Sequence, residues 1–336
     1  MRICGSLPAA CPAVVLALLL AACGDDATTN GPAVPDVTLT NLNLVHGLFC
    51  PPETDSCRLP DRVDLLMEWI AVECPDLVTL QEIWPPSLEL IEERAGTVCP
   101  FPYNVLAGES ASGVDDELVL SRYPATIVDQ LPLYIGFRRV LWTQIDHPTG
   151  LLDVYSTHLA SGADGGPDAC GDACPPECRA AGAQTVRECQ SVQTAEFIER
   201  THTVPGPALV SGDMNARPGS FVYRQFTDRG WLDSYLETGN PECAPATGIG
   251  CTSGRESELL HELEAPELNL TSRIDYVFLI PAADGSACRP TLIGPGPGGT
   301  GLWDDRPNPF AADCGPLPDP ICWASDHMGV RIGYTC

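Results

Sequence analysis

The chain of 336 residues contains no lysine, so all 18 of its basic side chains are arginine. Against 45 acidic residues, these arginines leave a formal net charge of −27 at pH 7. No run of basic residues interleaved with aromatics occurs either. A strongly acidic body repels polyanions at long range, so the composition disfavours capture of nucleic acid by general electrostatic attraction.

Beyond its N-terminus the chain also lacks a long apolar run. No stretch there approaches the roughly 18 consecutive apolar residues of a membrane-spanning helix. At the N-terminus itself, Arg2 supplies a minimal positive charge and Val14–Leu20 forms a short apolar core. This order is typical of an export signal, which we expect over residues 1–22.

The end of this signal resembles a bacterial lipobox. It has the sequence Leu-Ala-Ala-Cys, ending at Cys23, and in such a signal the cysteine is acylated and becomes the mature N-terminus. An ordinary secretory peptide, cut near Ala22, is the alternative. We predict lipid attachment at Cys23, and Gly24 favours the outer membrane of a Gram-negative envelope.

The remainder of the chain predicts a tether and one large domain. Residues 23–36 have no hydrophobic periodicity, which is typical of a flexible linker. Residues 37–336 contain no internal repeat and no long polar linker, and they are numerous enough to bury a sizeable core. We expect this domain to be a monomer.

Cysteine usage agrees with export. Loss of Cys4 and Cys11 with the signal, and use of Cys23 for the lipid, leaves 14 of the 17 cysteines, an even number. An oxidising compartment then favours disulfides. Three close pairs predict short disulfide loops: Cys50 with Cys57, Cys243 with Cys251, and Cys314 with Cys322.

A further cluster of cysteines has no connectivity that its spacing decides. It consists of Cys170, Cys174, Cys178 and Cys189. The spacing Cys-Pro-Pro-Glu-Cys within it also permits a metal site, although export favours disulfides.

Hydrophobic periodicity divides the domain into strands with helices between them. Helices are predicted over Arg62–Ala71, with Asp61 as its N-cap, Ser87–Ala95 and Gln184–Arg200. Strands are predicted over Val37–Leu44, Asp76–Leu80, Tyr103–Leu106, Glu117–Ser121, Val140–Asp146, Leu151–Thr157, Ala208–Ser211, Ile274–Ile280 and Gly329–Tyr334. Such an alternation requires sheet and helix layers, so the sequence predicts the α/β class.

Polar side chains stand where several of these strands end. They are Asn43, Glu82, His158, Asp213 with Asn215, Asp275, and Asp326 with His327. Carboxylates, carboxamides and histidines that converge from strand ends suit a hard divalent cation and water-driven attack on a phosphorus centre.

The motifs around these residues, in this order, resemble the endonuclease/exonuclease/phosphatase superfamily over roughly Val37–Cys336. They are Thr-Asn-Leu-Asn-Leu-Val-His-Gly, Thr-Leu-Gln-Glu, Ser-Thr-His-Leu, Ser-Gly-Asp-Met-Asn, Arg-Ile-Asp-Tyr and Ser-Asp-His-Met. The resemblance implies a four-layer sandwich, in which two packed mixed β-sheets are flanked by helices. It places the site across the strand ends at one edge.

The resemblance also implies a metal site at Glu82, Asn43 and Asp326, with Mg²⁺ as the cofactor and Mn²⁺ as a substitute. Mg²⁺ prefers oxygen ligands and is usually held by one or two carboxylates together with water and phosphate. Asn43 fits the amide position better than Asn41, which we expect to be a turn or edge residue.

For catalysis, the resemblance implies that His327 is the general base and that Asp275 fixes its tautomer. Asp213 would orient the attacking water or assist the leaving group. Asn215 would donate a hydrogen bond to the phosphoryl oxygens, and His158 would contact the scissile phosphate.

Three arginines are candidates to clamp phosphate, because a guanidinium binds oxyanions in a bidentate manner. They are Arg122 and the pair Arg138 and Arg139. We expect surface or sheet-edge charge to be the better description of each.

Substrate classes remain open at this stage. Acidic charge and surface tethering favour a phospholipid headgroup or a small phosphate ester, with an extracellular endonuclease as the alternative. A surface-binding lipoprotein without activity is disfavoured because every motif is intact. Two loops, Ser161–Ala183 and Ala282–Ala324, are long; Trp303 and Phe310 in the second either touch a bilayer or pin the loop.

Overall fold

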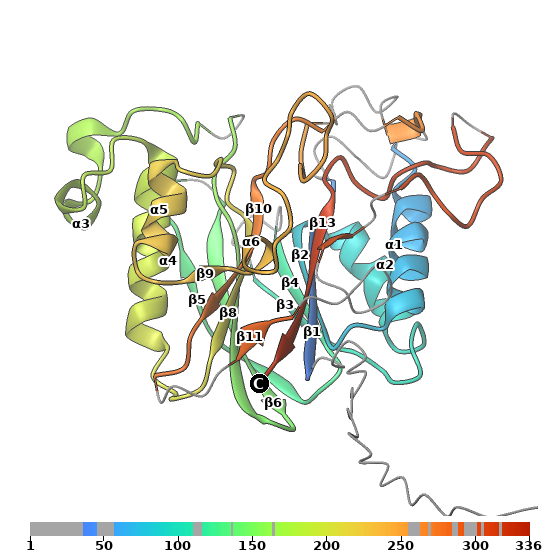
Figure 1. Ribbon diagram of the computed structural model, residues 1–336, viewed down its shortest axis with the longest axis horizontal. Helices are drawn as coiled ribbons and strands as arrows, with labels where there is room; N and C mark the ends of the chain where they lie inside the picture. The colour runs from blue at the N-terminus through green and yellow to red at the C-terminus, as the bar shows by residue number, and fades with distance from the viewer. Residues whose placement is uncertain are drawn as a thin grey trace, which may run out of the picture. The chain divides into compact units, whose positions relative to one another are not determined.

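The protein was analysed as a computed structural model, which describes residues 36–45, 57–109, 116–135, 137–162, 165–254, 263–267, 270–283, 288–291, 301–303, 306–315 and 318–336. All of these residues belong to one unit, Pro32–Cys336. Within it, two β-sheets lie between two layers of helices (Figure 1). The predicted α/β four-layer sandwich is therefore confirmed.

Seven strands form the first sheet. They are β1 (Val37–Asn43), β2 (Leu77–Ile83), β3 (Asn104–Ala107), β4 (Asp116–Ser121), β11 (Arg289–Pro290), β12 (Gly301–Trp303) and β13 (Gly329–Thr335). Their order is β11-β13-β1-β2-β4-β3, and β12 also pairs with β13. The central strand β1 runs parallel to β2 and antiparallel to β13.

Six strands form the second sheet. They are β5 (Ala125–Pro132), β6 (Arg139–His147), β7 (Gly150–His158), β8 (Ala208–Asp213), β9 (Leu232–Asp233) and β10 (Asp275–Ile280). Their order is β5-β6-β7-β8-β10-β9, with β7 parallel to β8. Apolar side chains of the two sheets, among them Leu39, Leu77, Val154 and Leu209, share one buried cluster.

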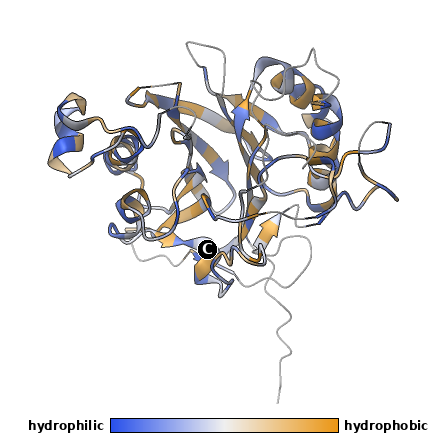
Figure 2. Ribbon diagram, turned by 90° about the horizontal axis from the view of Figure 1, so that it is seen from above, coloured by the Kyte–Doolittle hydropathy of each residue, from blue (hydrophilic) through white to orange (hydrophobic). Residues whose placement is uncertain are grey.

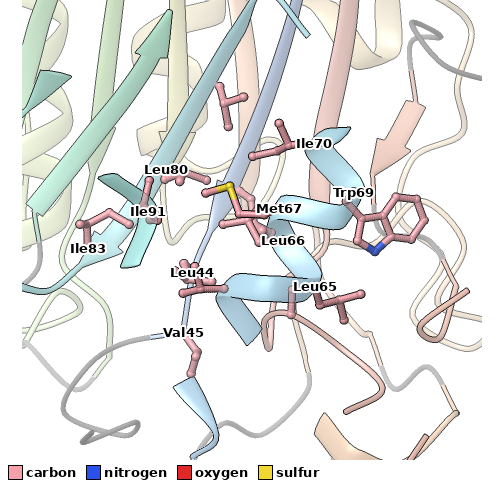
Figure 3. Packing of buried hydrophobic residues seen from close by; sticks show 14 of the residues in the cluster. Leu44, Val45, Leu65, Leu66, Met67, Trp69, Ile70, Leu80, Ile83 and Ile91 are labelled. Carbon is pink, nitrogen blue, oxygen red and sulfur yellow. The ribbon is translucent and has the colours of Figure 1, made fainter. Parts of the chain in front are cut away.

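Four main helices cover the outer faces of the sheets. They are α1 (Leu59–Glu73), α2 (Pro85–Ala95), α4 (Val186–Thr201) and α5 (Phe221–Thr227); the shorter helical elements are the 3₁₀ turn Gly171–Ala173, α3 (Pro176–Ala180) and α6 (Ser234–Glu237). These helices carry both hydrophilic and hydrophobic residues (Figure 2). In α1, Leu66 and Ile70 belong to the same buried cluster as Leu80 of β2 (Figure 3). The central strands of each sheet are thus buried on both faces, whereas strands at the edges, such as β5, remain largely exposed.

The topology brings several strand ends to one edge, at the top of Figure 1. Asn43 pairs with Gln81 in the parallel β1–β2 ladder, and His158 pairs with Asp213 in the parallel β7–β8 ladder. Asp275, the first residue of β10, lies opposite Asp213. Parallel neighbours end at the same edge of a sheet, so this topology concentrates the polar residues that the sequence singled out.

Six disulfides join described residues. They are Cys74–Cys99, Cys170–Cys174, Cys178–Cys189, Cys243–Cys251, Cys288–Cys336 and Cys314–Cys322. Two of the three predicted short loops are confirmed. The third involves Cys50, which lies outside the described residues. The four clustered cysteines all pair, so a metal site among them is disfavoured.

Several predictions about local structure were wrong. Strand β5 was not predicted, because its side chains are mostly exposed and give no apolar pattern. Helix α1 begins at Leu59 and its N-cap is Arg58, so Asp61 lies inside the first turn. Asn41 is not an edge residue; it is buried in β1, where its Oδ1 accepts hydrogen bonds from Thr79 Oγ1 and Gln81 Nε2.

The two aromatic residues of the long C-terminal loop pack against α1. Trp303 is buried, and its ring lies 6.3 Å from that of Trp69, while the ring of the partly exposed Phe310 lies 5.8 Å from Trp69. Trp303 therefore anchors the loop to α1 rather than contacting a bilayer. Within the described part of the chain, no helix combines the length and apolarity needed to cross a membrane.

Candidate active site

Asn43 joins the two sheets at their shared edge. Its Nδ2 donates a hydrogen bond to Glu82 Oε1 in the first sheet, over 3.0 Å, and to Asp213 Oδ2 in the second, also over 3.0 Å. Its Oδ1 is buried and has no hydrogen-bond partner among the described residues. A buried carbonyl oxygen without a donor is costly, so this atom is free to serve as a ligand.

Glu82 owes its orientation to an irregularity in β2. The β2–β4 register shifts between Leu80 and Ile83, and Glu82 has a φ of 61°, in the left-handed region. A bulge of this kind redirects a side chain away from the alternation of the strand. Such backbone strain persists where surrounding structure enforces it and is concentrated at functional sites.

The turn after β8 aims two side chains at the same point. Asn215 also has a left-handed backbone, with φ 48°, and its N–H donates to Asp213 Oδ1 over 2.7 Å. Its Nδ2 donates to Leu159 O and lies 3.0 Å from His158 Nε2. Asp213, Asn215 and His158 therefore form one contiguous polar group.

Arg138 fixes the tautomer of His158. Its Nη1 lies 2.6 Å from His158 Nδ1, and a guanidinium can only donate hydrogen bonds. Nδ1 therefore accepts, which places the imidazole proton on Nε2, so the nearby Nδ2 of Asn215 makes no hydrogen bond to that nitrogen. That nitrogen lies 3.4 Å from Asp213 Oδ2 and 3.8 Å from Glu82 Oε1, inside the site.

His327 and Asp275 form a second histidine–carboxylate pair. Both residues are buried, and His327 Nδ1 lies 2.9 Å from Asp275 Oδ2. Burial opposes a charged imidazole, but the charge and hydrogen bond of Asp275, together with the charges of Asp213 and Asp326, outweigh it and raise the pKa of His327 well above its usual value. The other nitrogen, Nε2, faces Asp213 Oδ2 at 3.9 Å.

Glu82 and Asp326 concentrate negative charge beside this pair. Burial, followed by the charge of Asp326, raises the pKa of Glu82 to about 8. Ser325 Oγ donates its single proton to the backbone carbonyl of Asn43 and lies 3.3 Å from Asp326 Oδ1. The positive charges of Arg138 and His327 offset this negative charge only in part, and the oxygen-rich donor set fits a divalent cation.

A second arrangement can also supply cation ligands. Asp213, Asp275 and His327 can each offer an atom so that the three atoms lie within 4.8 Å of one another. However, Asp275 and His327 are already bound to each other. We therefore favour the oxygen atoms of Glu82, Asn43 and Asp326 as the cation ligands.

The three arginines considered as phosphate clamps have different environments. Arg122 pairs with Asp76 beside the start of β2, at the other end of the strand from Glu82, as expected of a surface charge. For Arg138 and Arg139 that expectation was wrong, because both are buried. Arg138 reaches His158, whereas Arg139 contacts Gln130 and Glu117.

Arg187 is a site residue that the sequence analysis missed. It lies in the first turn of α4, where its Nε donates to Ala160 O over 2.6 Å and its Nη1 donates to Asn215 O. Three residues further on, Gln190 Oε1 accepts from Ala160 N over 2.8 Å. These contacts fix the loops that follow β7 and β8. The only sequence signal is an arginine and a glutamine one helical turn apart.

Comparison with known proteins extends these observations. A protein of Drosophila melanogaster assigned as a neutral sphingomyelinase is 26% identical over 201 residues, which span 55% of this chain and 42% of that protein. The chain thus covers less than half the length of this relative.

Solved structures share the fold. The mannosyl-6-phosphatase of Bacteroides thetaiotaomicron is 15% identical with a TM-score of 0.58, covering 89% of this chain and 100% of that one. TDP2 of D. rerio, complexed with a single-stranded DNA product, is 17% identical with a TM-score of 0.57, covering 89% and 99%.

A family model for the endonuclease/exonuclease/phosphatase family matches residues 40–327. That range begins before Asn43 and ends at His327, so it contains every residue of the site described above. Members of this family depend on a divalent metal. On this match, the chain belongs to the endonuclease/exonuclease/phosphatase family and is a hydrolase of phosphate esters.

Proposed function

We propose that the protein is an exported, lipid-anchored, Mg²⁺-dependent phosphoesterase that acts on a phospholipid headgroup or a small phosphate ester. One observation carries this proposal. The His327–Asp275 pair and the group of Asp213, Asn215 and His158 meet at the edge where Asn43 links the two sheets.

The cation would be held by Glu82 and Asp326, with the free Oδ1 of Asn43 as a further oxygen ligand. When bound, Mg²⁺ polarises a phosphoryl oxygen and offsets the charge that develops on it, and Mn²⁺ can replace it. The Nδ2 of Asn43 keeps Glu82 and Asp213 in place from the other side.

His327 is the proposed general base. A cation held by Glu82 and Asp326 would offset part of the negative charge that raises the pKa of His327 and would so favour the neutral imidazole. In that form the Nδ1 proton is committed to Asp275, and the lone pair of Nε2 is available to take a proton from water. Asp213 Oδ2 is 3.9 Å from this nitrogen, and both atoms can accept hydrogen bonds from one water molecule. Asp213 therefore orients the water that His327 deprotonates.

His158 and Asn215 are the proposed donors to the phosphate. Because Arg138 holds Nδ1 of His158, the Nε2–H is directed toward the site. Of the two N–H groups of the Asn215 carboxamide, one donates to Leu159 O, and the other, 3.3 Å from Asp213 Oδ2, is the proposed second donor. Preorganised donors of this kind stabilise the negative charge that grows on the phosphoryl oxygens.

Substrate and location rest on the sequence and on the relatives. Anchoring through Cys23 would place the domain at a membrane surface, and the net charge of −27 opposes capture of a nucleic acid. The assigned sphingomyelinase and the mannosyl-6-phosphatase support a lipid headgroup and a small phosphate ester, respectively. The likeness to TDP2 keeps an extracellular nuclease as the alternative.

The test is a comparison of substrates with the full chain and Mg²⁺. Sphingomyelin vesicles, bis-p-nitrophenyl phosphate and plasmid DNA are offered in parallel, with His327→Ala as the control. We expect the wild-type protein to hydrolyse sphingomyelin and bis-p-nitrophenyl phosphate, and the variant to hydrolyse neither. DNA nicking without hydrolysis of lipid or of the small ester would replace the proposal by the nuclease alternative, and wild-type rates in the variant would remove His327 as the base.

A further inference from the structure

A cavity of about 530 Å³ opens beside the proposed phosphate donors. Asn215 lies in its wall, so the cavity adjoins the strand-end site at this residue. Volumes of this size are typical of sites that hold a small ligand. A group esterified to the phosphate at Asn215 would therefore extend into it.

The outer wall of this cavity comes from the loop between β7 and α4, which two disulfides hold. Gly166 and Pro167 line the cavity, and Arg187 N donates to Gly166 O over 2.9 Å. A Cβ at Gly166 would lie 2.1 Å from Ala160 O, so only glycine permits this close approach. Cys170–Cys174 and Cys178–Cys189 brace the rest of the loop. The wall is thus attached directly to the loop that follows His158.

Most charged groups of the cavity are already engaged. The carboxylate of Glu188 caps α4, accepting hydrogen bonds from the backbone N–H groups of Gln184 and Thr185. The guanidinium of Arg187 is bound to the carbonyls of Ala160 and Asn215. Both side chains therefore already hold the backbone around the cavity.

Arg217 differs from these two residues. It also lines the cavity, its side chain is exposed, and it makes no ion pair with any of the described residues. It lies two residues after Asn215, so it is tied to the site through a short segment of chain.

We propose that this cavity is a recognition subsite for a second oxyanion on the substrate, with Arg217 as the residue that binds it. An exposed guanidinium pairs with phosphate or carboxylate through a planar fork of donors. The proposal rests on the proposed function, and among the substrates of that function it predicts a preference for phosphate esters that carry a second anionic group.

Binding to the full-length His327→Ala variant with Mg²⁺ tests the subsite separately from turnover. Titration calorimetry compares inositol 1,4-bisphosphate, inositol 1-phosphate and phosphocholine. We expect the bisphosphate to bind at least about tenfold more tightly than either monophosphate, since one charge-assisted pair is worth that much. Arg217→Ala should remove this preference, and Arg217→Lys should retain part of it.

Arg289→Ala is the matched control. Arg289 is also exposed, and it pairs with the end of β13 opposite to His327. Its removal changes the net charge equally and should leave the preference intact. An unchanged preference in Arg217→Ala, an equal loss in Arg289→Ala, or phosphocholine binding as tight as that of the bisphosphate would overturn the subsite.

Two further measurements distinguish the source of the ligand and the fate of the proposed function. The wild-type protein is offered phosphatidylinositol 4-phosphate in vesicles and soluble inositol 1,4-bisphosphate; hydrolysis of one identifies a lipid or a free sugar phosphate as the source. An Arg217-dependent preference with no hydrolysis of any ester would leave the subsite standing and reject the enzyme. Hydrolysis without that preference would reject the subsite and leave the proposed phosphoesterase standing.

Discussion

Two carboxylates at opposite ends of β2 have contrasting surroundings. Asp76, just before the strand, accepts hydrogen bonds from Thr38 N, Thr38 Oγ1, Arg122 and Tyr123. Glu82, near the other end, accepts one from Asn43, and burial beside Asp326 raises its pKa to about 8. A buried carboxylate that is fully satisfied stabilises the fold. One that has few donors and a raised pKa marks where a ligand is expected.

The largest loss of activity should come from removing the proposed base, His327, at the end of the sheets where Glu82 lies. We expect His327→Ala to lower kcat by about 10³ or more, since general-base catalysis contributes on that scale. The thermal unfolding midpoint should stay close to that of the wild type, because we expect the residues at the Glu82 end to serve catalysis rather than stability. A rate within a few fold of the wild type would contradict the assignment.

Glu82→Gln should separate metal binding from folding. In the wild type, Mg²⁺ should raise the unfolding temperature, because a ligand that binds only the folded state stabilises it. The variant should lose most of this shift together with most of its activity. Differential scanning fluorimetry with and without Mg²⁺ is the measurement. If Mg²⁺ raised the unfolding temperature of the variant as much as that of the wild type, the cation would instead be assigned to Asp213, Asp275 and His327.

The same variant gives a pH prediction in metal-free protein. The pKa of Glu82 is raised from its ordinary value of 4.5 to about 8 in the folded state. Between these two pH values the folded protein therefore binds more protons than the unfolded chain. Stability should therefore fall as pH rises through this window. Glu82→Gln should remove that decline, so the variant should be the more stable protein at pH 8. Parallel pH curves of unfolding temperature for the two proteins would contradict this reasoning.

Arg138→Ala should cause a smaller loss of activity. Without the guanidinium at Nδ1, His158 is free to take the other tautomer, so we expect kcat to fall by about 10–100-fold. Arg139→Ala is the control, because this neighbour is equally buried but contacts Gln130 and Glu117 instead. Equal losses in both variants would indicate a packing effect rather than control of the tautomer.

Asp76→Ala should show the opposite behaviour to the site variants. It leaves the N–H and hydroxyl of Thr38 without their acceptor, which we expect to cost about 3 kcal/mol of unfolding free energy. Activity per folded molecule should change little. Urea denaturation measures the stability, and kcat at low temperature measures the activity. A large loss of kcat in fully folded protein would show that Asp76 also serves catalysis, which would contradict the proposed difference between the two ends of β2.

The fold was predictable where buried strands and amphipathic helices repeat. The runs around Leu77–Leu80 and Ala208–Ser211 carry an apolar pattern because both faces of each sheet are covered, and their ends could be located within a few residues. Strand β5 was not predictable in this way, because its pairing with β6 rather than apolar burial makes it a strand. Asn41 was misread because nothing local shows that Thr79 and Gln81 will satisfy it.

The site residues were predictable as a set because they occupy strand ends in a recognisable order. Their partners were not. Arg138 meets His158 only because β6 and β7 pair in the sheet, and Arg187 reaches Asn215 only because α4 begins beside β8. Such contacts depend on the three-dimensional register of separate elements. A local pattern of residue types carries no information about that register.

The bond from Asn43 to Asp213 has a consequence for how the protein acquires activity. It spans 170 residues of sequence and links strands of different sheets. A folding intermediate in which only one sheet has formed would therefore lack an assembled site, however native its secondary structure. Recovery of hydrolysis during refolding should lag behind recovery of the far-ultraviolet circular dichroism signal, which makes catalysis a reporter of the final docking of the two sheets.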